Sequence, residues 1–298
     1  GVSAVQWSGG RLDNNGESLR VETGVYGLGI LDFRYEGNWY PATRAGASLE
    51  MVNPLAAREA WNEKASWQPC VPSPGGPSAF GVVTPPDTSV GVGEVFAIDA
   101  VVCPGPHPAA GVTVAWSTVS GPAGAVFTAP GNGRTYVTFP MAGVYEIRLL
   151  ATGPGGVQAS DTTVVTVSET YAQWAARVMP GLGAADREST SDPDKDVFCN
   201  LVEFALGGNP VRSDAGSLVT VESGSLPLTM TWRRNPYASP APVIVPEVSS
   251  DLQTWASGPG AVDSLLVTSG GGLETWRSVD AGPAGSPQRY LRLKVIQP

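Results

Sequence analysis

The sequence predicts a mostly β protein of serial β-sandwiches, interrupted by one short helical unit. The chain has 298 residues, with 37 Gly and 27 Pro but only 15% charged residues, a composition typical of sandwiches with many turns. Short runs that alternate apolar and polar residues recur along most of its length, as half-buried strands do. We therefore divide the chain into a partial sandwich at 1–78, a second sandwich at 79–168, a helical linker at 169–215 and a C-terminal sandwich at 216–298.

The first part carries three strand-like segments, at 18–23, 29–35 and 48–54, separated by turn sequences such as DNNGE. It resembles the second half of a lamin tail domain, an Ig-like sandwich that recurs in large secreted bacterial proteins. The resemblance rests on GRLDNNGESLRVE (10–22), LDFRYEGNWYPAT (31–43), GASLEMVNP (46–54), AWNEKASWQP (60–69) and SPGGPS (73–78). The first strands of such a domain would precede Gly1.

A half-domain of this kind has an unpaired edge and an incomplete core. Two explanations are open. In one, the upstream half of the domain was cut off and the chain is a fragment. In the other, a neighbouring chain supplies the missing strands by β-strand addition, and the protein is a polymerising subunit.

The second part alternates over six segments, among them GEVFAIDAVV, VTVAWSTV and GVYEIRLLAT. It resembles the polycystic-kidney-disease type of Ig-like domain, or its REJ-like relatives, with Trp116 and Tyr145 at positions that pack in the core. WSTVSGPAG (116–124) stands where the best-known members carry WDFGDG. The resemblance implies a spacer or adhesion module rather than a particular ligand.

The three cysteines allow at most one disulfide within the chain. Cys70 and Cys103 both lie beside Pro-rich turns, and they are the more plausible pair.

The most specific signal in the sequence is the loop at 192–203, DPDKDVFCNLVE. Short acidic side chains at alternate positions have the spacing of a calcium loop, which supplies a hard dication with about six to eight oxygens. The predicted ligands are the side chains of Asp192, Asp194, Asp196, Asn200 and Glu203, together with the carbonyl of Phe198. The alternative is an acidic, solvated turn that caps the following helix.

Two positions in the loop need comment. Val197 stands where calcium loops carry Gly, because the backbone there turns sharply, and a β-branched residue with φ > 0 is strained by roughly 1–3 kcal/mol. Cys199 holds a position that faces the core, so we expect a buried small hydrophobe rather than a nucleophile. The flanks predict helices at 169–179 and 200–206, with a glycine cap at 207–208.

The last part returns to strand patterns, as in PLTMTWRRN (227–235) and RYLRLKVIQP (289–298). With YAQWAA, the acidic loop, NLVEFALGGNP and EVSSDLQTW, these segments resemble a C-terminal module seen on many large secreted bacterial proteins. That module follows adhesins and hydrolases alike. The resemblance therefore implies an extracellular or cell-surface location and a role in assembly rather than a reaction.

Composition and motifs argue against several functions. The formal net charge is −9 and basic residues are sparse, so nucleic acid and anionic membranes are not expected partners. No apolar run approaches the roughly 18–20 residues that span a bilayer. The single histidine, His107, is flanked by prolines, which leaves no recognisable Ser-His-Asp, Cys-His or zinc arrangement. We therefore expect that the chain is not an enzyme.

The leading hypothesis is a non-enzymatic extracellular structural or adhesion protein whose linker is made rigid by calcium. As a surface or filament subunit, it would associate with itself or with other surface proteins through β-edge pairing. The alternative is the non-catalytic C-terminal tail of a larger secreted enzyme. A third hypothesis is a carbohydrate-binding module that stacks sugars on Trp39, Tyr40, Trp61 and Trp67, although half-buried tryptophans in sandwiches usually belong to a small core.

Overall fold

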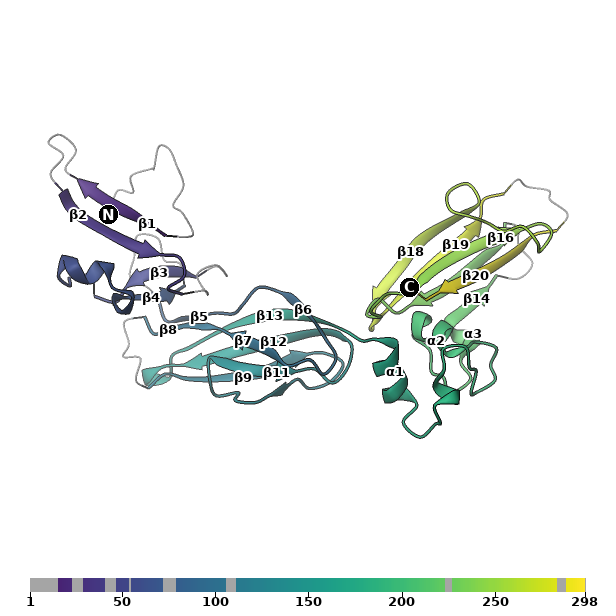
Figure 1. Ribbon diagram of the computed structural model, residues 1–298, viewed down its shortest axis with the longest axis horizontal. Helices are drawn as coiled ribbons and strands as arrows, with labels where there is room; N and C mark the ends of the chain where they lie inside the picture. Colours follow the sequence, from purple (N-terminus) through teal and green to yellow (C-terminus); the bar gives the residue numbers. More distant parts are fainter. Residues whose placement is uncertain are drawn as a thin grey trace. The chain divides into compact units, whose positions relative to one another are not determined.

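The computed structural model describes residues 16–22, 29–40, 47–53, 55–71, 79–105, 111–222, 227–282 and 288–297. Antiparallel sheets and a few short helices make up these ranges, and the predicted mostly β, sandwich-based fold is confirmed (Figure 1). The chain divides into two compact units. The N-terminal unit comprises Gly1–Thr88, Glu94–Pro140 and Tyr145–Val165, and the C-terminal unit comprises Ser89–Gly93, Met141–Val144 and Thr166–Pro298.

The N-terminal unit begins with two antiparallel strand pairs. β1 (Gly16–Glu22) pairs with β2 (Gly29–Glu36), and β3 (Ser48–Met51) pairs with β4 (Trp67–Cys70). The short 3-10 helices η2 (Arg58–Asn62) and η3 (Lys64–Ser66) lie between β3 and β4 in the chain. Phe33, Met51 and Trp67 are buried together, and the Phe33 ring centre lies 5.3 Å from that of Trp61. The predicted strands thus enclose a small aromatic core.

The rest of the N-terminal sequence forms a β-sandwich in which apolar side chains alternate along each strand. One sheet has the order β6-β13-β12-β9, the other has the order β10-β11-β7, and β5 pairs with β8. Tyr145, Ile147, Leu149 and Ala151 lie at every second position of β12 and are fully buried. Trp116 is 4% exposed, so both aromatic residues predicted for the core are in it. The strands are β5 (Gly81–Val83), β6 (Thr88–Gly91), β7 (Phe96–Asp99), β8 (Val101–Cys103), β9 (Thr113–Ser120), β10 (Val126–Phe127), β11 (Arg134–Thr138), β12 (Gly143–Thr152) and β13 (Gln158–Ser168), with a 3-10 turn, η4 (Pro154–Gly156), before β13.

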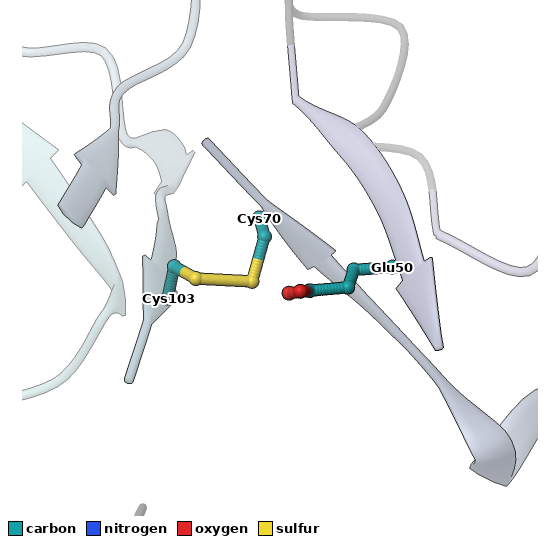
Figure 2. A group of neighbouring side chains, drawn as sticks. All are labelled: Glu50, Cys70 and Cys103. Atoms are coloured by element: carbon teal, nitrogen blue, oxygen red, sulfur yellow. A yellow bond between two sulfur atoms is a disulfide. The ribbon is translucent and has the colours of Figure 1, made fainter. Parts of the chain in front are cut away.

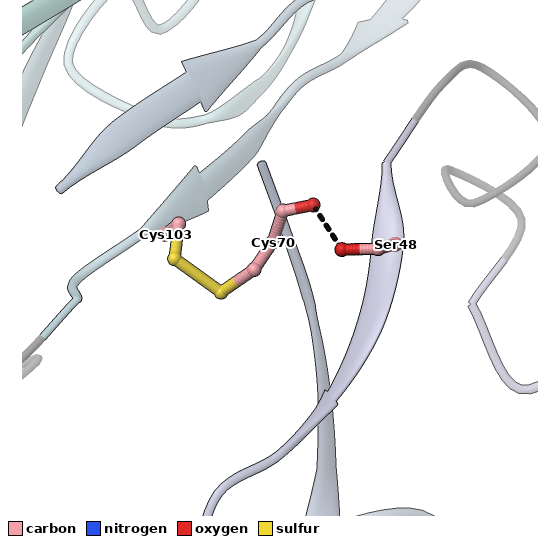
Figure 3. Close-up of a disulfide and its surroundings, with 3 residues drawn as sticks. All are labelled: Ser48, Cys70 and Cys103. Atoms are coloured by element: carbon pink, nitrogen blue, oxygen red, sulfur yellow. Dashed lines mark hydrogen bonds between the residues drawn. A yellow bond between two sulfur atoms is a disulfide. The ribbon is translucent and has the colours of Figure 1, made fainter. Parts of the chain in front are cut away.

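A disulfide between Cys70 and Cys103 joins the end of β4 to the end of β8, which confirms the predicted pairing (Figure 3). Both cysteines are fully buried, and Ser48 Oγ donates a 3.2 Å hydrogen bond to the Cys70 carbonyl. Glu50 extends from neighbouring β3 toward the bridge (Figure 2). Because the two cysteines are 33 positions apart in the sequence, the bridge restricts the unfolded chain, and it fastens the β3–β4 pair to the sandwich.

The C-terminal unit combines short helices with another sandwich. α1 (Tyr171–Val178) begins at a capping box formed by Thr170 and Gln173. α2 (Asn200–Leu206) ends at Gly207, whose φ of 76° is the left-handed conformation that the predicted glycine cap requires. The sheets have the orders β14-β15-β19-β18 and β17-β16-β20. The remaining elements are η5 (Ala185–Arg187), α3 (Ala215–Leu218), β14 (Val219–Val221), β15 (Thr229–Arg234), β16 (Val243–Ser249), β17 (Ala256–Ser257), β18 (Val262–Gly270), β19 (Leu273–Asp280) and β20 (Tyr290–Ile296).

Helix α2 contributes to two hydrophobic cores. Phe204 packs in one core with Trp174 of α1, their ring centres 5.4 Å apart. Leu206 packs in the other with Leu218 of α3 and Trp232 of β15. The helical segment that we expected to act as a linker therefore shares its core with the final strands. Among the described helices, none has the length and apolar character that a membrane crossing requires.

Candidate metal centre

The chain between η5 and α2 winds around the carboxylate of Asp192. Its Oδ1 accepts hydrogen bonds from the backbone N–H groups of Lys195, at 2.8 Å, and Asp196, at 3.3 Å. Its Oδ2 accepts one from Val197 N–H at 3.1 Å. Lys195 and Val197 have φ of 62° and 78°, so the sharp turn expected at the usual glycine position is present with a valine in it.

The loop brings carboxylates together in two overlapping groups. The oxygens of Asp192, Asp194 and Asp196 lie within 4.8 Å of one another, and so do those of Asp196, Glu203 and Asp214. Four of these residues belong to the predicted ligand set. Asp214 was not predicted, because it lies eleven positions after Glu203 in the sequence and its place before α3 is that of an ordinary helix N-cap.

Several oxygens in this cluster are buried without a hydrogen-bond donor. Glu203 has no exposed surface, and neither of its carboxylate oxygens has a partner. In the cluster, Asp194 Oδ2 and Asp214 Oδ1 are also buried without a partner. So is Oδ1 of Asn200, the predicted ligand at the start of α2. Buried polar atoms in proteins nearly always have partners, and an unpaired buried carboxylate is costly. A set of acceptors without donors is the environment that a hard cation satisfies.

The Asp196 carboxylate also accepts hydrogen bonds from backbone N–H groups on both sides of α2. Its Oδ1 accepts from Phe198 N–H at 3.0 Å. Its Oδ2 accepts from the N–H groups of Asp214, at 2.8 Å, and Ala215, at 2.7 Å. Asp196 is only 8% exposed. The loop is thereby bonded to the start of α3 before any ion is considered.

The other predicted site residues are placed less directly. The Asn200 amide nitrogen donates to the carbonyls of Asp186 and Glu188, at 2.8 Å each, and so ties the η5 segment to α2. The Phe198 ring packs against the core around Leu206, and the role of its carbonyl as a ligand stays a prediction. Cys199 is a free thiol that is half-buried rather than buried, since it lies at the N-cap of α2.

Electrostatics in the cluster follow from burial and from the gathering of like charges. Burial, followed by the negative charges of the neighbouring aspartates, raises the pKa of Glu203 to about 8. Burial, followed by the charge of Asp196, also raises the pKa of Asp194 and of Asp214. For Asp196 desolvation is the largest influence and acts upward, yet three backbone N–H donors together hold its pKa below the ordinary value. The metal-free cluster is therefore an unfavourable place for its own negative charge.

Replacing Val197 by Gly is expected to stabilise the loop. The Val197 side chain is 86% exposed, so packing contacts do not offset the strain of its left-handed backbone conformation. Glycine removes that strain but adds freedom to the unfolded chain, which leaves a net gain of roughly 1 kcal/mol in unfolding free energy. Urea unfolding measures it, and Lys195→Gly, an unbranched residue at a similar φ, should gain less. A less stable Val197→Gly protein would contradict the assignment of strain.

The aromatic residues that were candidates for sugar stacking pack against one another in a small core. Trp67 is 9% exposed, and its ring lies 5.4 Å from Phe33 and 5.7 Å from Trp61. Tyr40 donates its hydroxyl to the Trp67 carbonyl at 2.8 Å. These contacts match the small aromatic core that was the alternative for these residues. His107 lies outside the described residues.

The solved structures described below are each similar to about a third of this chain. No family model matches the sequence, and no curated protein matches it. Among solved structures, the PKD domain from the KIAA 1837 protein is 18% identical, with a TM-score of 0.26, over 32% of this chain and 91% of that domain. The PKD domain of human KIAA0319 is 15% identical, with a TM-score of 0.26, over 33% and 90%. A nucleoside hydrolase-related protein from Saccharophagus degradans, associated with carbohydrate metabolism, is 15% identical, with a TM-score of 0.25, over 30% and 26%.

Proposed function

We propose that this chain is a non-enzymatic extracellular structural or adhesion protein whose C-terminal unit is held rigid by calcium. The observation that carries the proposal is the Glu203 carboxylate, which is fully buried, lacks any donor and lies beside Asp196 and Asp214. A protein rarely retains such an arrangement unless a cation completes it.

The chemistry of the donors favours calcium. The clustered candidate ligands are all carboxylate oxygens, and the further predicted ligands, the Asn200 amide and the Phe198 carbonyl, would also offer oxygen. Oxygen ligands suit a hard cation that takes six to eight of them. Zinc prefers Cys and His, and the free Cys199 is not among the clustered residues.

The proposed role of the ion is mechanical. Helix α2, which carries Glu203, packs Phe204 into the core with α1 and Leu206 into the core of the sandwich. A cation on Glu203 would fix α2 and, through it, both cores of the C-terminal unit. Without the cation, mutual repulsion among the carboxylates loosens the same elements.

Self-association or pairing with other surface proteins through a β edge belongs to the same proposal. Strand β18 is at the end of its sheet, and successive residues of this strand expose apolar side chains. Leu265 is 68% exposed, Leu266 41% and Val267 52%. An exposed apolar edge strand is a template for another strand, so β18 is the region where we expect partner contacts.

Calorimetric unfolding in calcium and in chelator tests the proposed function. A ligand that binds only the folded state at 100 times its Kd adds about 2.7 kcal/mol, which raises Tm by roughly 5–10 °C in a unit of this size. We expect calcium to shift the transition of the C-terminal unit and to leave that of the N-terminal unit in place. Magnesium at equal concentration serves as the control for unspecific screening. Identical transitions in calcium and chelator would overturn the proposal.

A further inference from the structure

We propose that Asp214 is an additional ligand of the cation, so that the ion clamps the loop at 192–203 to the segment that begins the C-terminal sandwich. The inference rests on the proposed cation binding and extends it beyond the twelve-residue loop. It assigns the site a partner segment, α3 and β14, that no loop motif includes.

Asp214 does not cap the helix that it precedes. It is the N-cap residue of α3, yet its side chain makes no capping hydrogen bond. The Asp196 carboxylate accepts from the N–H groups of Asp214 and Ala215 instead. Capping by Asp196 therefore leaves the Asp214 carboxylate without a structural use at the helix end.

Asp214 Oδ1 lies among buried carboxylate oxygens. This oxygen is buried and has no hydrogen-bond partner. The Asp214 carboxylate lies within 4.8 Å of ligand oxygens of Asp196 and Glu203, and both Glu203 oxygens are also buried and unpaired. A backbone N–H of Asn209 and the charges of Arg212 and Arg233 favour the ionised carboxylate of Asp214, but burial and the charge of Asp196 outweigh them and its pKa is raised. Three carboxylates that converge in this way have one common requirement, a positive ion between them.

The proposed clamp would join α2 to the start of α3. Asp214 directly precedes α3, and Leu218 of α3 is buried in the same core as Leu206 of α2. α3 leads into β14, which is at the end of the sheet β14-β15-β19-β18. A cation shared by Glu203 on α2 and Asp214 before α3 therefore fixes the two sides of this core against each other.

Asp214→Asn in the full chain tests the inference, with calcium affinity measured by titration calorimetry. The substitution keeps the size of the side chain and removes its charge. We expect binding to weaken at least 10-fold, as loss of one charged ligand does. Asp186→Asn is the matched control, because it makes the same charge change at an exposed residue next to the site, and it should bind within twofold of the original protein. Asp214→Ser, which retains a capping residue, replaces Asp214→Asn if the latter does not fold in chelator.

Hydrogen exchange supplies an independent readout. In the original protein, calcium should slow exchange of the Asp214 and Ala215 amides, which bond to Asp196, and Asp214→Asn should remove most of that protection. Unchanged affinity and unchanged protection in the Asp214 variants would overturn the clamp while leaving calcium binding intact. If the original protein takes up no calcium, the proposed function fails first, and the clamp fails with it.

Discussion

Glu203→Gln is expected to make the metal-free C-terminal unit more stable while abolishing its response to calcium. Glu203 is fully buried, has no donor and lies among aspartates. Its ionised form therefore destabilises the metal-free fold, and a neutral amide of the same size removes that effect. A pKa that is raised by one corresponds to about 1.4 kcal/mol, and after local relaxation we expect Glu203→Gln to gain roughly 2–4 kcal/mol in unfolding free energy above pH 8.

The sign of the pH dependence follows from the raised pKa. The unfolded chain releases the Glu203 proton near the model-peptide value of 4.5, whereas the folded state retains it to about pH 8. Metal-free stability due to this group is therefore complete below pH 4.5 and is lost as the pH rises toward 8. Glu203→Gln should remove this decline, so its advantage over the original protein grows across that interval.

Denaturant unfolding in chelator at several pH values, repeated in calcium, measures both effects. Glu188→Gln is the control, because Glu188 is exposed and its side chain is not one of the clustered carboxylates. We expect calcium to raise the stability of the original protein and of the control, but not of Glu203→Gln. A Glu203→Gln protein that is less stable than the original in chelator would contradict the claim that the buried, unpaired carboxylate destabilises the metal-free fold.

The loop could be predicted because its information is local. Alternate carboxylates from Asp192 to Asp196 meet through short-range turns, and one turn of α2 carries Glu203 back toward them. Asp214 could not be found in this way, since its approach to Glu203 depends on how α3 packs beside α2. The same holds for Asp196, whose spacing indicated a ligand but not a cap for a helix that begins nineteen residues later.

The sequence carries the information that α2 packs against two different cores, but the prediction did not include it. The helix NLVEFAL carries apolar residues on nearly all sides, which is the pattern of a helix buried on more than one face. The prediction of a helix at 200–206 did not include burial on a second face. In the structure Val202 and Leu206 belong to the sandwich core, and Phe204 belongs to the core with α1.

Asp196→Ala should destabilise the metal-free unit, the opposite of Glu203→Gln. The substitution takes away the acceptor of three backbone N–H groups, those of Phe198, Asp214 and Ala215. Hydrogen bonds to a charged group contribute about 1.5–3 kcal/mol each and are not additive, so a loss of roughly 2–4 kcal/mol is expected. Asp196→Asn keeps one acceptor oxygen and should lose less. Calcium binding should be lost in Asp196→Ala, because the residue belongs to both carboxylate groups.

The two variants together separate a cation site from a solvated acidic cap. In a cap, the carboxylates serve N–H donors, so removing either charge weakens the fold and calcium changes nothing. In a cation site, Glu203 has no donor to lose, and only its loss stabilises the metal-free protein. Chelator unfolding of both variants at pH 8.5 should therefore displace the midpoint in opposite directions from the original protein. If both variants were less stable than the original protein, the loop would be a helix cap rather than a cation site.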